Sequence, residues 1–103
     1  MITAITKFNL SQPLSLQEAK DIFLSTAPKY RDVPGLVRKC YVVFDNGNAV
    51  GGIYLWNSRK DAEAIYTESW KEFVREKYGS DPEITYLDTP VVVDNVAQEI
   101  ING

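Results

Sequence analysis

The chain has 103 residues, of which 45% are hydrophobic and 24% are charged, and its formal net charge is -3. This acidic balance argues against binding to nucleic acid, because that affinity rests largely on Lys and Arg side chains at the phosphates. The sequence has no histidine and a single cysteine, Cys40, which excludes histidine-based nucleophilic triads, a histidine ligand to haem and an internal disulfide. A metal site built from carboxylates alone is not expected.

The length and composition predict one domain over residues 1–103, with a short C-terminal tail at 94–103. No stretch of the chain approaches the roughly 20 apolar residues of a membrane span, and the N-terminus lacks the apolar run of a signal peptide. We therefore expect a cytoplasmic location and no membrane partner.

The first predicted element is a strand at 2–10, where apolar side chains alternate with polar ones. A capping box formed by Ser15 and Glu18 then predicts that a helix begins just after Ser15. Pro28 discourages continuation of this helix because its ring cannot occupy a helix interior without strain.

The next predicted element is a β-hairpin with arms at 36–44 and 49–56. Asn46 and Gly47 lie between the arms and favour a two-residue type I′ turn, because both residues tolerate positive φ angles. Pro34-Gly35 marks the break that precedes the hairpin.

A second helix is predicted from Ser58, which can cap it, to Tyr78, after which Gly79 ends it. A last strand is expected at 83–93, and the tail at 94–103 could contain a helical turn. The order β-α-β-β-α-β predicts an α+β fold of the ferredoxin-like type, an antiparallel sheet with both helices on one face. The other face would be left apolar and uncovered, so we expect a homodimer.

The turn position sets the hairpin register and pairs Lys39 with Tyr54, Tyr41 with Gly52, and Val37 with Trp56. One face would then carry Val37, Lys39, Tyr41, Val43, Val50, Gly52, Tyr54 and Trp56. The other face would carry Leu36, Arg38, Cys40, Val42, Phe44, Ala49, Gly51, Ile53 and Leu55. We assign the first face to the helix side, where it would meet Tyr66, Trp70 and Phe73 of the second helix.

This aromatic face has two interpretations. The rings could simply pack as core, or they could line a cavity for a flat, oxygenated small molecule. A register slip of one residue would exchange the two faces. Lys39 must be paired, reach an edge of the sheet or serve a function, because burial of an unpaired lysine is costly.

Three segments carry a resemblance to a known family: YRDVPGLVRK at 30–39, GGIYLW at 51–56, and the helix start at 58–64. Together they resemble the YdhR-like monooxygenase family, which is similar to the wider antibiotic-biosynthesis monooxygenase group. The resemblance covers nearly the whole chain and implies a dimeric α+β barrel of ferredoxin-like subunits. It is much less specific for a reaction than for the fold.

The resemblance implies a monooxygenase without a cofactor that oxidises a small phenol, hydroquinone or anthrone-like aromatic molecule. Trp56 matches a tryptophan that lines the pocket in that group, and Thr6 falls near a first-strand position that is asparagine in the haem-degrading branch. Haem degradation is disfavoured because the iron-holding histidine of that branch has no counterpart here.

Within such a pocket, Lys39 could lower the pKa of a phenol, and Trp56 could stack on the ring. A hydrogen bond to the phenolate could come from Tyr41, Tyr54 or Tyr66. The residues chosen as catalytic candidates are Lys39, Tyr41 and Trp56. The candidate substrate-binding residues are Thr6, Phe8, Tyr54, Tyr66, Trp70 and Phe73. Two alternatives stay open: a non-catalytic dimer that binds a small molecule in the same pocket, and an interaction module whose aromatic cluster is only core.

Overall fold

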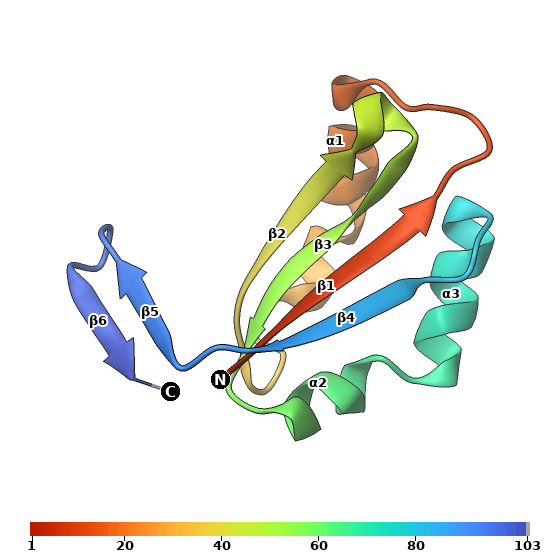
Figure 1. Ribbon diagram of the computed structural model, residues 1–103. Coiled ribbons are helices and arrows are strands. Elements are labelled where there is room, and N and C mark those ends of the chain that lie inside the picture. The colour runs from red at the N-terminus through yellow and green to blue at the C-terminus, as the bar shows by residue number, and fades with distance from the viewer. Residues whose placement is uncertain (103) are drawn as a thin grey trace.

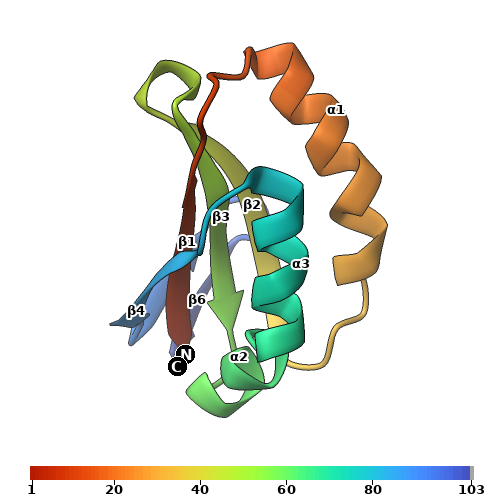
Figure 2. The same cartoon turned by 90° about the vertical axis from the view of Figure 1, so that its right-hand side faces the viewer.

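The computed structural model describes residues 1–102, except the side chain of Asp45. Its main sheet has four antiparallel strands in the order β2-β3-β1-β4 (Figure 1). The strands are β1 (Ile2–Asn9), β2 (Leu36–Phe44), β3 (Ala49–Trp56) and β4 (Glu83–Asp88). The helices lie together on one side of this sheet (Figure 2), which confirms the ferredoxin-like α+β fold.

The first helix, α1 (Leu16–Thr26), begins with the expected capping box. The backbone N–H of Glu18 donates to Ser15 Oγ at 3.1 Å, and the N–H of Ser15 donates to Glu18 Oε1 at 3.0 Å. After Thr26 the chain tightens into a 3₁₀ turn, η1 (Ala27–Tyr30), with Pro28 in its first turn, where the missing N–H costs nothing. No helix in the described part of the chain is long and apolar enough to cross a membrane.

The predicted second helix is broken in two, so the expectation of one helix from Ser58 to Tyr78 was wrong. The two pieces are α2 (Arg59–Ile65) and α3 (Glu68–Tyr78). Tyr66 leaves the helical conformation with a ψ of 56°, and the Thr67 side chain then caps α3 by accepting from the N–H of Trp70 at 3.2 Å. A threonine cap inside an otherwise helical pattern is the physical reason for the break.

The hairpin register is confirmed through most of its length, with Lys39 opposite Tyr54 and Tyr41 opposite Gly52. Asn46 and Gly47 have φ angles of 55° and 94°, as the Asn-Gly signal predicts. The expected pairing at the open end was wrong, because a β-bulge makes Leu36, rather than Val37, the partner of Trp56.

The bulge also exchanges the environments of two neighbouring residues. Leu36 packs against the core, whereas the side chain of Val37 is 47% exposed. The N–H of Asn57 donates to the carbonyl of Gly35 at 2.8 Å, and this bond fixes where the chain enters β2. The β-bulge therefore places one extra residue in β2, between Leu36 and Arg38, just after this hydrogen bond.

The C-terminal segment forms a separate hairpin that extends away from the main sheet (Figure 1), made of β5 (Val91–Asp94) and β6 (Glu99–Asn102). The expected strand at 83–93 was therefore wrong beyond Asp88. The expected helical turn in 94–103 was also wrong, because a turn at 95–98 joins β5 to β6; residue 103 lies outside the described residues. Pro90 lacks the N–H needed to continue a strand ladder. The Asp94 side chain accepts from the N–H groups of Val96 and Ala97, both at 3.0 Å, and this reverses the chain.

The core lies between the sheet and the helices, and its side chains come from every layer. Its buried members are Ala4, Phe8, Ala19, Val50, Tyr54, Trp56, Ala62, Tyr66, Trp70 and Val74. This core is aromatic where β3 faces α3, and that is where the candidate site lies.

Gly51 gives a test of the close contact between β1 and β3. A Cβ atom at this position would overlap the carbonyl oxygen of Thr6, which is backbone and cannot rotate away. We expect Gly51→Ala to lower the free energy of unfolding by about 1–3 kcal/mol, measured by urea denaturation. Cys40→Ala is the matched control, because Cys40 is exposed on the same face and its replacement should change stability by less than about 0.5 kcal/mol. Equal stability of the two variants would contradict the close contact.

Candidate functional site: a lysine enclosed by tyrosine rings

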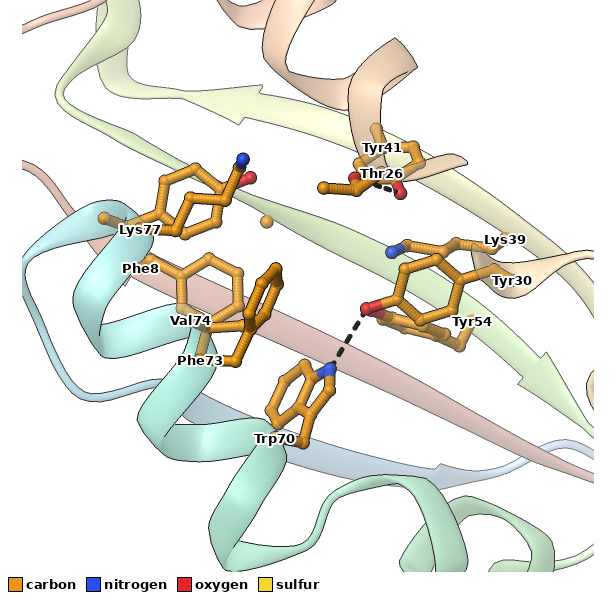
Figure 3. Close-up of a pocket in the computed structure, with 12 residues that line it drawn as sticks. Phe8, Thr26, Tyr30, Lys39, Tyr41, Tyr54, Trp70, Phe73, Val74 and Lys77 are labelled. Atoms are coloured by element: carbon orange, nitrogen blue, oxygen red, sulfur yellow. Dashed lines mark hydrogen bonds between the residues drawn. The ribbon is translucent and has the colours of Figure 1, made fainter. Parts of the chain in front are cut away.

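A cavity lies between the sheet and the helices, and residues of β1, β2, β3, α1, η1 and α3 form its wall (Figure 3). The lining residues are Phe8, Thr26, Tyr30, Lys39, Tyr41, Gly51, Tyr54, Trp70, Phe73, Val74, Lys77 and Tyr78. Lys39 points its nitrogen into this cavity, between Tyr41 on one side and Tyr30 on the other (Figure 3).

The ammonium group of Lys39 is held against the faces of three tyrosine rings. Its Nζ lies 3.3 Å from the ring centroid of Tyr30, 3.8 Å from that of Tyr41 and 4.7 Å from that of Tyr54. Each distance is within the range of a cation–π contact. The three rings come from η1, β2 and β3, so the lysine joins the helical layer to the sheet.

Gly52 makes room for this arrangement. A Cβ atom on Gly52 would come within 2.9 Å of Tyr54 Cε1 and 3.3 Å of Lys39 Cε. The space left by the missing side chain opposite Tyr41 is therefore filled by the stem of Lys39 and by the ring of Tyr54.

Lys39 has no ion-pair partner among the residues that the structure describes. Burial, followed by the nearby positive charge of Lys29, lowers the pKa of Lys39 to about 7. The ring faces favour the charged form, but the cost of removing an ammonium from water is larger. At neutral pH a large share of the molecules therefore carries a neutral amine at this position.

The hydroxyls of Tyr41, Tyr54 and Tyr78 stay protonated at neutral pH. Burial raises the pKa values of Tyr41 and Tyr54 above the usual range, and it raises the pKa of Tyr78 to about 12. Tyr41 Oη shares a hydrogen bond of 2.8 Å with Thr26, and Tyr30 Oη accepts from Trp70 Nε1 at 3.0 Å. These bonds fix two of the three rings that contact the lysine.

The cavity combines the amines of Lys39 and Lys77, several phenol hydroxyls and apolar ring faces. Within residues 1–102, excluding the Asp45 side chain, no cluster of three or more His, Cys, Asp or Glu side chains could hold a metal ion. Chemically, the site can therefore accept a proton at the amine of Lys39 and donate hydrogen bonds from the hydroxyls.

The enclosed space is small. It amounts to about 20 Å³, which holds a water molecule and not an aromatic ring. On the outer side, Tyr30, Lys39 and Tyr41 also line an open groove of about 420 Å³. Its other lining residues are Ala27, Arg31, Asp32, Leu36, Val37 and Arg38. Lys39 thus stands between a nearly filled cavity and a surface groove.

The structure brings six of the predicted site residues together at the cavity wall. These are Phe8, Lys39, Tyr41, Tyr54, Trp70 and Phe73. Three others lie in the layer behind it. Trp56 is fully buried, stacks on Tyr54 at 5.9 Å between ring centroids, and donates from Nε1 to Tyr66 Oη at 3.1 Å. Thr6 is also fully buried, and its hydroxyl accepts from the N–H of Gly52 at 3.0 Å.

Sequence reasoning missed four polar residues of the wall: Thr26, Tyr30, Lys77 and Tyr78. Tyr78 follows Trp70 and Val74 at steps of four residues, so helical spacing carries a signal that could have found it. Tyr30 lies in a 3₁₀ turn with no periodic pattern, and nothing in the sequence orients its ring.

No family model matches the sequence, and no curated protein matches it. Several solved structures share its fold, and the class that they represent includes monooxygenases of the antibiotic-biosynthesis type. The specific YdhR-like assignment stays a prediction.

One of these structures is a monooxygenase from Streptomyces coelicolor, from the gene ActVA-Orf6, in complex with nanaomycin D. It has a TM-score of 0.64 and 17% identity over 85% of this chain and 86% of its own. SnoaB, a cofactor-independent oxygenase from Streptomyces nogalater, has a TM-score of 0.59 and 18% identity over 85% and 91%. A conserved protein from Methanosarcina mazei has a TM-score of 0.62 and 16% identity over 85% and 91%. At these identities the likeness establishes the fold.

The lowered pKa of Lys39 predicts a specific pH dependence of stability. Between pH 7 and about pH 10 the unfolded chain keeps a proton on this lysine that the folded chain has largely lost, so the contribution of Lys39 to stability rises with pH. We expect the free energy of unfolding of the wild type to rise relative to that of Lys39→Met between pH 7 and pH 9.5, measured by urea denaturation. Subtracting the two curves removes the tyrosine titrations common to both proteins. A difference that stays constant over this pH range would show that the folded pKa of Lys39 is not lowered.

Proposed function

We propose that the protein is a cofactor-independent monooxygenase that oxidises a small phenolic or anthrone-like aromatic molecule, with Lys39 as the general base. The observation that carries this proposal is the unpaired amine of Lys39 among three tyrosine rings, with a pKa lowered to about 7. A base whose pKa is close to the working pH is effective in proton transfer.

The reaction begins with proton transfer from the substrate to the neutral amine of Lys39. A hydroxyl of Tyr41 or Tyr54 then donates a hydrogen bond to the negative oxygen that develops on the substrate. The resulting anion is electron-rich and is oxidised by O₂. For a ring CH₂ group, one oxygen atom forms the new C=O bond and the other leaves as water with the two hydrogens, so the substrate supplies all the electrons.

Substrate entry requires the rings to move, because about 20 Å³ cannot accept an aromatic ring. The groove on the outer side of Tyr30 and Tyr41 offers about 420 Å³ and leads to the same lysine. The substrate ring would take the place of the Tyr30 or Tyr41 ring against the amine of Lys39. Lys39 would then keep an aromatic contact when the tyrosine moves away.

The structural neighbours support an oxygenase over other enzyme classes. SnoaB is a cofactor-independent oxygenase, and the Streptomyces coelicolor monooxygenase was solved with nanaomycin D bound. The cytoplasmic location and the single domain over residues 1–103 stay predictions.

The activity is tested by O₂ consumption and quinone formation with anthrone in metal-free protein. We expect turnover that rises with pH through about pH 7, as Lys39 loses its proton, and a loss of about 10²–10⁴-fold in Lys39→Met. Lys60→Met is the control, because Lys60 is an exposed lysine on α2 and should leave the rate unchanged. Equal rates in the two variants would remove Lys39 from the reaction.

A second candidate function is non-catalytic binding of an aromatic molecule at the same site. The nearly filled cavity favours it, because packed rings suit a site that opens only for a ligand. Binding without O₂ consumption would identify this function. Quenching of tryptophan fluorescence would report it, chiefly through Trp70, which lines the cavity, whereas Trp56 is fully buried. If the protein shows no quenching and no turnover, the aromatic cluster serves only as core.

We also propose that the protein works as a homodimer that covers the face of the sheet opposite the helices. This face is apolar and partly open, with Ile53 40% exposed and Leu87 46% exposed. The β5–β6 hairpin supports the same proposal, because Val91, Val93 and Ile100 are exposed on it and an isolated two-stranded hairpin is only marginally stable.

The dimer is tested by placing a charge in the centre of the open face. We expect Ile53→Asp to shift the sedimentation mass at micromolar concentration from dimer to monomer, because a carboxylate there would have to be buried without a partner. Leu24→Asp is the matched control, since Leu24 is 59% exposed on α1, on the opposite side of the sheet. A monomeric mass for the wild type would contradict the dimer.

A further inference from the structure

We propose that Lys39 is a nucleophile as well as a base, and that it binds small aromatic aldehydes covalently, as an imine, at the inner end of the surface groove. This inference uses the same side chain as the proposed function but requires neither O₂ nor a phenolic substrate. It assigns the site a second ligand class, carbonyl compounds.

The placement of the amine carries the first step. Lys39 is common to the walls of the inner cavity and the outer groove, and its nitrogen points into the cavity between the rings of Tyr30 and Tyr41, which also line the groove (Figure 3). The groove of about 420 Å³ is large enough for a single aromatic ring with its carbonyl group, which the inner cavity is not. An aldehyde that enters the groove would reach the nitrogen by displacing the ring of Tyr30 or Tyr41, and its own ring would replace that contact.

The absence of a carboxylate partner carries the second step. An ammonium held in an ion pair is a poor nucleophile, because its lone pair is occupied by a proton that the partner stabilises. Lys39 contacts ring faces instead, and no ion pair to it occurs in the described part of the chain. Asp32 lines the groove, but no ion pair joins it to Lys39.

The titratable and charged groups around the amine come from four elements and the loop after η1. They are Lys29 and Tyr30 of η1, Arg31 and Asp32 of the following loop, Arg38 and Tyr41 of β2, Tyr54 of β3, and Lys77 and Tyr78 of α3. Cations outnumber the one carboxylate in this set, which favours the neutral form of the amine. Arg38 forms its own ion pair with Asp94 at 2.8 Å.

The chemistry balances without an oxidant or a reductant. The lone pair of Lys39 Nζ attacks the carbonyl carbon, and a proton moves from the nitrogen to the former carbonyl oxygen to give a carbinolamine. Loss of that oxygen as water forms the C=N bond. Tyr30 and Tyr41 supply ring faces for the aromatic part of the aldehyde. Burial raises the pKa of Tyr41, so its protonated hydroxyl can donate a hydrogen bond to the departing oxygen.

Imine formation is tested by trapping it with sodium cyanoborohydride in the presence of benzaldehyde at pH 7, followed by peptide mapping of the full chain. We expect the benzyl adduct on Lys39 to exceed that on Lys60 by at least about tenfold. An amine with a pKa of about 7 is half neutral at this pH, whereas an amine at the ordinary lysine value of about 10.4 is neutral in roughly one molecule in 2,000. The adduct at the Met1 α-amine lies on a separate peptide and does not affect the comparison.

The pH dependence of the adduct ratio separates the proposal from simple accessibility. The Lys39-to-Lys60 ratio should fall about a hundredfold between pH 7 and pH 9.5, because the neutral fraction of an exposed lysine rises by more than about a hundredfold over this range and that of Lys39 only about twofold. A ratio near one at pH 7, or a ratio that does not change with pH, would overturn the proposal.

Variants show which outcome belongs to which proposal. Lys39→Arg keeps the positive charge and should lose the adduct at this position, whereas Lys60→Arg should keep it, with far-UV circular dichroism as the check on folding. If Lys39→Arg does not fold, the peptide map of the wild type still decides. Trapping at Lys39 without anthrone oxidation would support the imine and contradict the oxygenase. Anthrone oxidation without trapping at Lys39 would support the oxygenase and contradict the imine.

Discussion

The contact of Lys39 with three tyrosine rings is the interaction on which the site depends. A lysine in the layer between sheet and helices would ordinarily be excluded by its desolvation cost. Here its stem crosses the space left by Gly52, and its nitrogen rests on ring faces from η1, β2 and β3. The rings stabilise the charged form of Lys39 and hold its side chain in place. Burial lowers the pKa of Lys39, so the neutral form is also populated at physiological pH. The site therefore offers a fixed amine that can bind or release a proton near neutral pH.

The other aromatic residues hold this arrangement from behind. Trp56 donates to Tyr66, Trp70 donates to Tyr30, and Tyr41 is bonded to Thr26. Each bond gives a buried polar atom a partner, and no buried side-chain nitrogen or oxygen in the described residues lacks one. These hydrogen bonds therefore fix the orientation of the rings. The rings in turn fix the position of the Lys39 side chain. The function assigned to one amine rests on the geometry of a whole layer.

Much of the fold could be predicted from the sequence, because its strongest signals are local. The Ser15–Glu18 capping box and the Asn46-Gly47 turn each specify a short backbone geometry, and the turn then fixes the pairing of Lys39 with Tyr54. Two features were missed because the apolar pattern continues through them without interruption. The break follows from the Thr67 cap, and the bulge after Leu36 follows the bond between Gly35 and Asn57, and neither interaction changes the apolar pattern.

The candidate site was predictable where strand alternation applied, as for Lys39, Tyr41 and Tyr54. It was not predictable at Tyr30, because a ring on a 3₁₀ turn follows no period. Trp56 shows the limit of alternation in another way. It lies on the predicted face of the sheet. It does not line the cavity, however, because it is fully buried against the ring of Tyr54, which does.

The interruption between α2 and α3 has a mechanical consequence. Five of the 12 residues around the cavity lie on α3, which is bounded at one end by the Thr67 cap and at the other by Gly79, with a φ of 83°. A continuous helix from Ser58 would couple any movement of these residues to the packing of Ala62 beneath it. As a separate segment of 11 residues, α3 is positioned by its own contacts, among them the Trp70–Tyr30 hydrogen bond and the stacking of Tyr78 on Phe8. One wall of the site is thus a single short helix with its own two caps, and the sheet supplies the opposite wall.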